Sequence, residues 1–533
     1  MAYPERPGGL SELARYGFAD LSGTMAKLDQ LVDLVGDAGR AAIASLAKSP
    51  DPDQALNTLL GFAEADKARI KALLKREDSA TRLCLVLGAS SALGDYLRRQ
   101  PAAFAEFEKP VVALPSNDEL VASLTAAAKT ALAQGLDTQR IWSAVRIEYR
   151  RQLLRIAIFD LSAADPRMAQ PAVAAALADV AGAALEAGLV VARAELLGSS
   201  EHGMFAADEV ADTRLAVMAM GKCGARELNY ISDVDVIFVG QSSNERTSHQ
   251  RAVEVATKLA TRMMRAMDGT ATEPGLWQVD PNLRPEGKSG ALVRTLDSHI
   301  SYYDRWAESW EFQALLKARP LAGDLELGED YVRALAPKVW SSASRDGFVE
   351  SAQKMRERVT AHIPADEVNR QIKLGPGGLR DIEFTVQLLQ LVHGRTDDSV
   401  RQRDTLGALD ALAHAGYVGR SEASAFADHY RFLRLLEHRI QLSNLRRTHL
   451  MPVAEPARRA LARAVNLRWT ADDMIAEWER VKLEVRSLHQ RIFYRPLLSA
   501  VARLDDQNFE LSSAQANDRL KAIGFEDPLG ALT

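Results

Sequence analysis

One short stretch limits the possible folds more than any other feature, because it interrupts a chain that otherwise has helical patterning. Val234 to Val239 is rich in β-branched residues, which is typical of a buried strand. Leu215 to Met220, Leu276 to Asp280 and Ala291 to Thr295 are further short apolar runs. Gln250 to Met267 has helical spacing and lies between two of them. The sequence therefore predicts a compact α/β domain of ~130 residues within a helical chain.

The remaining sequence has the apolar spacing of helices. Asn117 to Ala133 and Arg140 to Leu161 carry apolar residues at intervals of three and four. Phe432, Leu436 and Ile440 form a stripe of the same kind within a longer segment. Such stripes indicate helices that pack in bundles. We therefore predict a mainly α, multi-domain protein whose α/β core is flanked by helical bundles.

Charge and cysteine content exclude several classes of protein. The chain has 66 Lys and Arg against 71 Asp and Glu, a net charge of −5, whereas a nucleic-acid binder carries a basic excess. Its two cysteines, Cys84 and Cys223, make neither a disulfide framework nor a cysteine zinc site. Charged residues interrupt the most apolar region, Pro171 to Leu197, so we expect no membrane span. We expect a cytoplasmic protein without a secretory signal.

The pattern with the clearest chemistry is a glycine turn followed by two aspartates. Gly221 and Lys222 precede Asp233 and Asp235, which are separated by one residue at the start of the predicted strand. Alternate strand residues point to the same face, so the two carboxylates form a platform for a cation such as Mg²⁺, which prefers oxygen ligands. The turn lets backbone N–H groups approach a phosphate, and Ser232 can add a hydroxyl contact.

A two-metal site needs a third carboxylate from a neighbouring strand, and Asp280 is the best candidate because it ends an apolar run. Arg284 and Lys288 follow in a glycine-containing loop, where they would face the negative charge of a nucleotide. A lone pair of alternate aspartates is common on solvated turns. Together, the glycine turn, the strand pattern and Asp280 favour a nucleotidyl-transfer site.

A second glycine cluster, Gly375 to Gly378, precedes the charged and apolar segment Leu379 to Phe384. Its glycines can bring the backbone close to a neighbouring element and start a helix. One interpretation is packing at a domain interface, with this segment where the helices after residue 331 meet the α/β core. The other is that Arg380 or Glu383 contributes to the rim of the active site.

Several of these motifs, taken together, resemble a known family. Residues 221–238 are similar to the nucleotidyltransferase motif of glutamine-synthetase adenylyltransferase, also called the adenylylating and deadenylylating enzyme. Five further stretches are similar to the same family, in the same order along the chain: 88–95, 279–285, 316–319, 372–384 and 493–497. The resemblance covers nearly the whole chain, and the alanine- and arginine-rich composition resembles actinobacterial members.

The resemblance implies that this chain corresponds to half of a tandem protein. Family members carry two DNA-polymerase-β-like nucleotidyltransferase domains, each with helical domains, in a chain nearly twice as long. The single pair of alternate aspartates and the motif order resemble the N-terminal half, which removes AMP from a tyrosine of glutamine synthetase. The C-terminal half attaches AMP from ATP. Asp527 to Thr533 has the pattern of a helix start, which we interpret as the beginning of the second half, cut by truncation.

We accordingly expect five segments along the chain. They are a helical region at 1–110, a helical region leading into the core at 111–198, a palm-like nucleotidyltransferase domain at 199–330, a helical bundle at 331–505, and a linker toward a second catalytic half at 506–533.

The resemblance also implies a reaction and its participants. Inorganic phosphate would attack the α-phosphorus of the adenylyl-tyrosine and release ADP and free tyrosine, as one step in the regulation of nitrogen assimilation. Two Mg²⁺ ions would be held by Asp233, Asp235 and Asp280. The implied nucleotide- and phosphate-binding residues are Gly221, Lys222, Ser232 and Arg284. The implied partners are adenylylated glutamine synthetase, phosphate and ADP, with a PII-type signal protein and glutamine as effectors and with neither nucleic acid nor membrane.

Three other interpretations remain open. The same metals serve the forward reaction, ATP-dependent adenylylation of the tyrosine. A polymerase or an RNA nucleotidyltransferase would need a basic groove, which the charge balance does not favour. A helical scaffold with an inactive site would not need to keep all three carboxylates.

Overall fold

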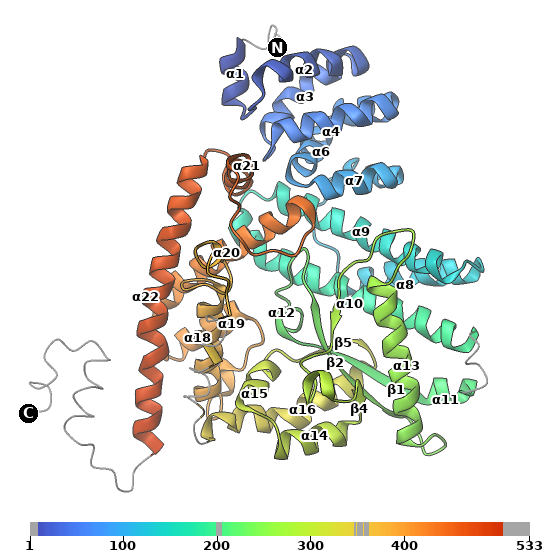
Figure 1. Ribbon diagram of the computed structural model, residues 1–533, viewed down its shortest axis with the longest axis vertical. Helices are drawn as coiled ribbons and strands as arrows, with labels where there is room; N and C mark the ends of the chain where they lie inside the picture. The colour runs from blue at the N-terminus through green and yellow to red at the C-terminus, as the bar shows by residue number, and fades with distance from the viewer. Residues whose placement is uncertain (1–8, 199–204, 346–347, 349–354, 357–361, 505–533) are drawn as a thin grey trace, which may run out of the picture. The chain divides into compact units, whose positions relative to one another are not determined.

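The computed structural model describes residues 9–198, 205–345, 348, 355–356 and 362–504 (Figure 1). The chain forms two compact units, each built from separate stretches of sequence. The first unit takes its described residues from Met1–His299, Arg319–Asp330 and Arg434–Ala476. The second takes them from Ile300–Ala318, Tyr331–Leu433 and Glu477–Thr533. The predicted five-segment division stays a prediction, and its last segment, 506–533, lies outside the described residues.

The first unit begins with a group of short helices. They are α1 (Gly9–Arg15), α2 (Leu21–Val35), α3 (Asp37–Ala47), α4 (Pro52–Ala65), α5 (Lys67–Leu74), α6 (Glu77–Ala89) and α7 (Ser91–Arg99). Capping side chains define several of their starts. Asp51 accepts a hydrogen bond from the backbone N–H of Gln54 at 3.0 Å, and Pro52 occupies the first helical position of α4.

Three long helices follow: α8 (Asn117–Ala133), α9 (Thr138–Ser162) and α10 (Pro166–Gly198). The first two confirm the predicted helices. Among the described helices, α10 alone is long and apolar enough to cross a membrane, with a mean hydropathy of 1.7 over its most apolar window. However, 83% of that window is buried, and α10 packs against α8, α9 and α13 (His249–Asp268). This burial is typical of a core helix.

The α/β part of the first unit is a small mixed sheet (Figure 1). Its strands are β1 (Thr213–Ala219), β2 (Val234–Ser242), β3 (Val279–Asp280), β4 (Val293–Arg294) and β5 (Arg319–Gly323). β1 is antiparallel to both β2 and β5, whereas β3 and β4 each run parallel to β2. The helix α13 packs against β1 and β2, and α10 contacts β5. Two short helices adjoin the first strand: α11 (Ala207–Asp212) precedes β1, and α12 (Gly221–Gly224) lies between β1 and β2.

The sequence predicted most of this arrangement. The runs at 215–220 and 234–239 overlap β1 and β2, the run at 291–295 contains β4, and α13 confirms the predicted intervening helix. Only the last two residues of the run at 276–280 form a strand, so that prediction was too long. No strand was predicted at β5, because Pro320 and Gly323 interrupt its apolar pattern and its outer residue Leu321 is only partly buried.

The helices after β4 are shared between the units. They are α14 (Leu296–Arg305), α15 (Ser309–Leu315), α16 (Leu325–Ser341), α18 (Leu379–His393), α19 (Thr405–His414), α20 (Arg420–Asn444), α21 (Glu455–Val465) and α22 (Ala471–Leu504). The chain passes between units within α14, α16, α20 and α22. The predicted apolar stripe lies on α20, where Phe432 and Leu436 are buried.

The second glycine cluster has both of the structural roles that the sequence predicted for it. Gly378 is the N-cap of α18, so the cluster starts a helix. Gly377 has φ +77°, and a Cβ atom there would lie 2.1 Å from the carbonyl oxygen of Lys482 on α22. This close approach joins two helices of the second unit. The predicted contact of this cluster with the α/β core stays a prediction.

Candidate active site

The sheet brings two of the three predicted carboxylates together. Asp235 on β2 and Asp280 on β3 are register partners in the parallel strand pair. Both side chains are partly buried, and one carboxylate oxygen of Asp280 accepts a hydrogen bond from the backbone N–H of Asn282 at 2.8 Å. Direct partners on neighbouring strands carry their side chains on the same face. Two carboxylates from two strands therefore face one point above the sheet.

The glycine turn lies directly against this carboxylate pair. The backbone N–H of Met220 donates to the carbonyl oxygen of Asp235 at 2.9 Å. Gly221 follows with φ +52°, and a Cβ atom there would lie 2.6 Å from a carboxylate oxygen of Asp235. Both the positive φ and the close approach require glycine at this position. The predicted turn beside the aspartates is therefore present.

Asp233 is engaged differently from the other two aspartates. It lies one residue before β2, and its carboxylate forms an ion pair with the guanidinium of Arg447. Arg447 is 62% exposed and Asp233 19% exposed, so the pair lies near the surface. Nothing in the sequence marks Arg447 as this partner, because it lies in a loop more than 200 residues away that has no pattern of its own.

Carboxylate oxygens suit Mg²⁺, and the strand pair supplies two of them from different strands. Within the described residues, however, no three His, Cys, Asp or Glu side chains gather as a metal-binding group. Asp235 and Asp280 could therefore offer oxygen ligands to one cation, and Asp233 would have to leave Arg447 to join them. A site for two Mg²⁺ ions stays a prediction.

Lys222 has a partner that the sequence did not reveal. Its ammonium lies 2.7 Å from a carboxylate oxygen of Glu437 on α20 and 3.4 Å from the side-chain oxygen of Asn229. The side chain of Glu437 is 1% exposed and that of Lys222 is 10% exposed. The lysine charge is thus balanced inside the protein, next to the glycine turn. Contact between Lys222 and a phosphate stays a prediction.

The same part of α20 supports the loop between the glycine turn and the aspartates. Arg434 is fully buried and donates to the side chain of Asn229 and to the carbonyl oxygens of Glu227 and Leu228. The backbone N–H of Ile231 donates to the side-chain oxygen of Gln441, one helical turn or more further along α20, at 3.3 Å. This loop is therefore held by side chains from a helix about 200 residues later in the chain.

A buried ion pair holds the loop at a further point. Arg439 of α20 donates to both carboxylate oxygens of Asp160 at the end of α9. Asp160 also accepts a hydrogen bond from the hydroxyl of Tyr230 at 2.7 Å. Burial raises the pKa of Tyr230 well above its usual value, and the neighbouring Asp160 adds to the effect. The hydroxyl is therefore a stable donor that fixes the loop three residues before Asp233.

Arg284, a basic residue near the carboxylates, forms its hydrogen bonds with backbone carbonyl groups. Arg284 donates to the carbonyl oxygens of Pro281, Lys288 and Gly290, which closes the loop after β3. Burial lowers the pKa of Arg284, while the nearby Asp280 acts in the opposite direction. Its predicted contact with a nucleotide stays a prediction, as does that of Ser232, which lies partly buried directly before Asp233.

Cys223 and Arg319 belong to the structure of the glycine turn. Cys223 is buried, and burial raises the pKa of its thiol to about 12, so no thiolate nucleophile forms there near neutral pH. Arg319, the first residue of β5, donates to the carbonyl oxygens of Cys223 and Gly224 at 3.1 and 3.2 Å. These bonds satisfy the last carbonyls of α12.

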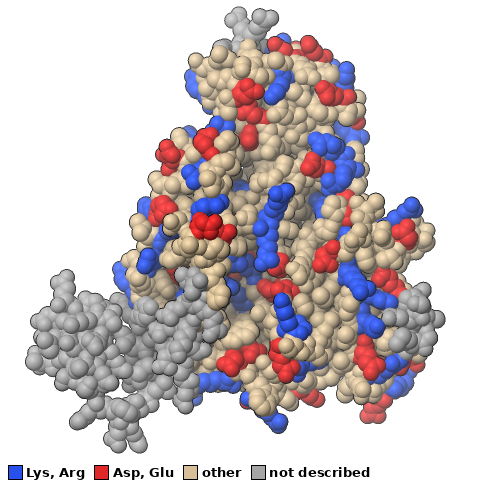
Figure 2. Space-filling view, in the orientation of Figure 1, with Lys and Arg blue, Asp and Glu red and all other residues tan. Residues whose placement is uncertain are grey.

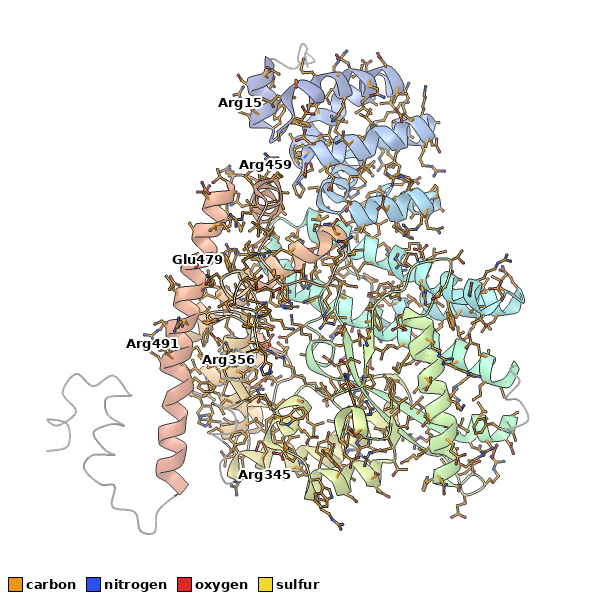
Figure 3. All side chains as sticks on the ribbon, in the orientation of Figure 1. Arg15, Arg345, Arg356, Arg459, Glu479 and Arg491 are labelled. Carbon is orange, nitrogen blue, oxygen red and sulfur yellow. The ribbon has the colours of Figure 1, made fainter. Side chains whose placement is uncertain are left out.

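The two predicted rim residues lie in the second unit. Arg380 donates to the carboxylate of Glu383 at 3.1 Å, and Glu383 is only 2% exposed. The intervening Asp381 accepts from the backbone N–H of Gly377 at 2.7 Å and from Arg356 at 2.8 Å, a residue labelled in Figure 3. These contacts stabilise the start of α18. A role at an active-site rim stays a prediction.

Charged side chains of both signs are interspersed over the face of the molecule drawn in Figure 2. This mixture agrees with the net charge of −5 and with the absence of a basic excess in the sequence.

Comparison with known proteins identifies the domains that carry these features. Residues 80–334 match the family described as glutamate-ammonia ligase adenylyltransferase, and residues 350–493 match the family described as GlnD PII-uridylyltransferase. The first match contains the glycine turn, all three aspartates and the whole sheet.

Three relatives illustrate the similarity, and each is named bifunctional glutamine synthetase adenylyltransferase/adenylyl-removing enzyme. The protein of Leifsonia xyli subsp. xyli is 53% identical over 531 residues, covering 98% of this chain and 53% of the relative. That of Streptomyces avermitilis is 47% identical over 539 residues, covering 99% and 51%. That of Mycobacterium avium is 46% identical over 504 residues, covering 92% and 48%.

Over nearly its whole length the chain is similar to these bifunctional enzymes. The resemblance noted from the sequence motifs is therefore confirmed, including the likeness to actinobacterial members. The α/β core lies within the residues that match the adenylyltransferase family, and it fits a nucleotidyltransferase domain of DNA-polymerase-β type, as predicted. The chain spans about half the length of the relatives that it matches.

Proposed function

We propose that this chain removes AMP from the adenylyl-tyrosine of glutamine synthetase by phosphorolysis. The observation that carries the proposal is the pairing of Asp235 with Asp280 beside the turn at Gly221, within residues that match an adenylyltransferase family. The order of the motifs favours the adenylyl-removing half of such an enzyme. The relatives' names include both activities, so the direction of the reaction is the part that the proposal adds.

The proposed reaction exchanges one phosphorus–oxygen bond for another. An oxygen of inorganic phosphate bonds to the α-phosphorus of the adenylyl group, and the bond from that phosphorus to the tyrosine oxygen breaks. The products are ADP and a tyrosine phenolate, which takes up a proton. Because the phenol has a pKa of ~10, the phenolate leaves more readily than an aliphatic alkoxide would.

The protein's contribution to such a reaction is mainly position and charge. Asp233, Asp235 and Asp280 would hold Mg²⁺, which when bound neutralises charge on phosphate oxygens. The turn at Gly221 places backbone next to Asp235, and the contacts from α20 keep the turn and the aspartates in a fixed relation. Preorganised groups of this kind need not rearrange as charge develops in the transition state.

The participants follow from the same proposal. Adenylylated glutamine synthetase, phosphate and ADP would be the partners, with a PII-type signal protein and glutamine as effectors, in the cytoplasm. The match of residues 350–493 to a PII-uridylyltransferase family supports a link to PII signalling. The alternative is the forward reaction, in which the same carboxylates support transfer of AMP from ATP.

A labelling experiment tests the direction. Glutamine synthetase carrying radiolabelled AMP on its tyrosine is incubated with this chain, Mg²⁺ and phosphate, and the released nucleotide is identified. We expect phosphate-dependent release of ADP, loss of release in Asp235→Asn, and normal release in Asp410→Asn, which changes an exposed aspartate of α19. Two parallel incubations replace phosphate with pyrophosphate, or supply unmodified glutamine synthetase with labelled ATP. Release only as ATP with pyrophosphate, or efficient incorporation of label from ATP, would assign the chain to the forward reaction.

A further inference from the structure

A cavity of about 550 Å³ lies within the first unit, and none of the three candidate metal ligands lines it. Its wall comes from five parts of the chain: the end of α3 with Lys48, α6 with Leu85, the junction of α9 and α10, α20 with Arg439, and residues 463–469. Small-molecule sites in proteins commonly have volumes of ~300–1,000 Å³. The proposed reaction gives this cavity no role.

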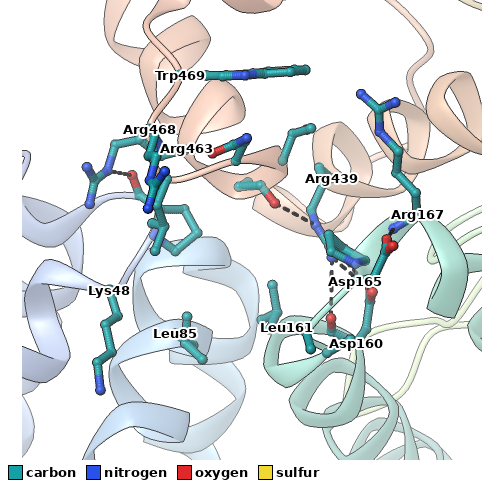
Figure 4. A pocket seen from close by; sticks show the side chains of 18 residues that line it. Lys48, Leu85, Asp160, Leu161, Asp165, Arg167, Arg439, Arg463, Arg468 and Trp469 are labelled. Atoms are coloured by element: carbon teal, nitrogen blue, oxygen red, sulfur yellow. Dashed lines mark hydrogen bonds and ion pairs between the residues drawn. The ribbon is translucent and has the colours of Figure 1, made fainter.

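Two opposite sides of the cavity are apolar. Trp469 extends along one side with its ring edge-on to the viewer, and Leu85 and Leu161 lie on the other (Figure 4). The guanidinium carbon of Arg167 lies 5.8 Å from the centre of the Trp469 ring. An indole faced by aliphatic side chains suits a flat ring, which can stack on the indole.

The charged side chains of the wall are predominantly basic. The wall contains Lys48, Arg167, Arg439, Arg463 and Arg468, against two carboxylates, Asp160 and Asp165. Asp160 is already engaged by Arg439 and Tyr230. Asp165 accepts hydrogen bonds from the backbone N–H groups of Arg167 and Met168 at 3.0 and 3.1 Å, which caps α10. Lys48 pairs with Glu77 outside the wall at 3.2 Å. The arginines therefore dominate the cavity's electrostatic character.

Backbone carbonyl groups hold the side chain of Arg463 in place. Its guanidinium donates to the carbonyl oxygens of Tyr16, Ala47, Ser49 and Pro50, at distances between 2.8 and 3.2 Å. These neutral acceptors fix its orientation without cancelling its charge. Burial lowers the pKa of Arg463, and the nearby Arg459 lowers it further. A positive charge that is costly to bury in this way would be stabilised by an anion in the cavity.

We propose that this cavity binds a small organic anion with a planar ring, of the nucleoside monophosphate class. The ring would lie between Trp469 and the aliphatic side chains. The phosphate would meet Arg468, whose guanidinium can bind two phosphate oxygens, and would lie in the positive field of Arg463. This site goes beyond the proposed function and does not depend on it.

Two residues of the cavity wall also stabilise the loop that leads into the candidate active site. Arg439 and Asp160 line it, and Asp160 accepts the hydrogen bond of Tyr230, three residues before Asp233. A bound anion would attract Arg439 and thereby act on the ion pair that holds this loop. The site is placed to regulate the loop.

Calorimetric titration of the full chain with AMP tests the proposal. The titration is done in EDTA, where the three aspartates have no cation to offset their repulsion of a phosphate. We expect one AMP per chain, at least tenfold weaker binding in Arg468→Ala and in Trp469→Leu, and unchanged binding in Arg140→Ala, an exposed arginine that does not line the cavity. Inorganic phosphate alone should bind at least tenfold more weakly than AMP, because it lacks the ring.

Fluorescence supplies a second readout that a folding defect cannot imitate. AMP should quench part of the tryptophan emission of the parent chain, and Trp469→Phe should keep binding while losing that quenching. The proposal is overturned if AMP gives no binding heat, or if Arg468→Ala and Trp469→Leu, both folded by circular dichroism, bind it as the parent does. Phosphate binding as tight as that of AMP would overturn the assignment of a planar ring.

Discussion

The ammonium of Lys222 lies 2.7 Å from a carboxylate oxygen of Glu437, although 215 residues separate the two in the chain. Glu437 also lies 2.6 Å from the guanidinium of Arg434, so one buried carboxylate balances two cations. This arrangement joins α20 to the glycine turn. It holds the ammonium of Lys222 next to the glycine turn.

Glu437→Gln should lower the free energy of unfolding by about 3 kcal/mol, because it leaves Arg434 buried without a carboxylate. Urea denaturation followed by circular dichroism measures the change. The matched control is Glu455→Gln on α21, where the carboxylate is 67% exposed and lies 3.9 Å from Arg459. The control should cost less than about 0.5 kcal/mol. Equal costs for the two variants would contradict a structural role for the buried carboxylate.

The sequence reveals residues that belong to a local pattern, but it does not reveal contacts between residues far apart in the chain. Asp235 and Asp280 could be predicted because each ends or begins an apolar run, and strand periodicity then sets their faces. Glu437 and Arg447 could not, because nothing local marks a charged residue that meets a partner about 200 residues earlier. The only available signal was the cluster of charged residues from Arg434 to Arg439 within an otherwise apolar helix pattern.

The same distinction explains the errors in the strand predictions. The run at 276–280 has the composition of a strand, but only its last two residues are in register with residues of β2. β5 pairs with β1 in spite of Pro320 and Gly323, and a register shift accommodates them. Edge positions and irregular pairing are set by the neighbouring strand, which composition does not describe.

Asp235→Asn should lower the rate of adenylyl release by at least roughly 100-fold, because even residues that only support a metal's ligands have effects of that size. The fold should lose little stability, since the substitution removes one of two neighbouring like charges. Turnover at saturating Mg²⁺ and a denaturation curve measure the two effects. Asp233→Asn should behave in the same way. Near-normal rates in both variants would show that the metal-site assignment is wrong.

Gly377→Ala should lower the free energy of unfolding by at least about 2 kcal/mol. The residue has φ +77°, and the added Cβ would lie 2.1 Å from the carbonyl oxygen of Lys482. Gly416→Ala is a closely matched control, since Gly416 has φ +79° but nothing within 4 Å of the Cβ position. The control should cost only about 1 kcal/mol, the cost of the left-handed conformation alone. Similar losses in the two variants would exclude the close helix contact as the cause.

His299 predicts how stability depends on pH. Burial lowers its pKa to about 4, whereas a histidine in the unfolded chain has a pKa of ~6.5. Below pH ~6.5 the unfolded state binds a proton that the folded state does not, so stability falls as the pH drops toward 4. The full loss is roughly 3 kcal/mol, at ~1.4 kcal/mol for each pKa unit. Above pH ~6.5 this contribution is constant.

Denaturant unfolding at several pH values between 7 and 4.5 measures this dependence. His299→Gln should reduce the slope of the free energy of unfolding against pH, because glutamine does not titrate. The reduction should correspond to at most one bound proton. His414→Gln, which changes an exposed histidine of α19, should leave the slope unchanged. A slope in His299→Gln equal to that of the parent chain would contradict the assignment of this proton to His299.

Arg447→Ala should strengthen Mg²⁺ binding by about fivefold, which corresponds to roughly 1 kcal/mol. In the structure the guanidinium of Arg447 forms an ion pair with Asp233, so a cation that uses Asp233 must displace it. Removing the arginine removes that competition. Because Arg447 is 62% exposed, the free energy of unfolding should change by less than about 1 kcal/mol. Calorimetric titration with Mg²⁺ in the absence of nucleotide measures the affinity.

Arg446→Ala provides the control for this substitution, since it removes the same charge from the neighbouring exposed residue and leaves the ion pair in place. It should raise Mg²⁺ affinity less than Arg447→Ala does. Adding Asp233→Asn to Arg447→Ala should then cancel the gain, because the carboxylate that the arginine released would be gone. If Arg447→Ala, Arg446→Ala and the double variant all bind Mg²⁺ alike, then Asp233 is not a ligand. The cation site would in that case consist of Asp235 and Asp280 alone.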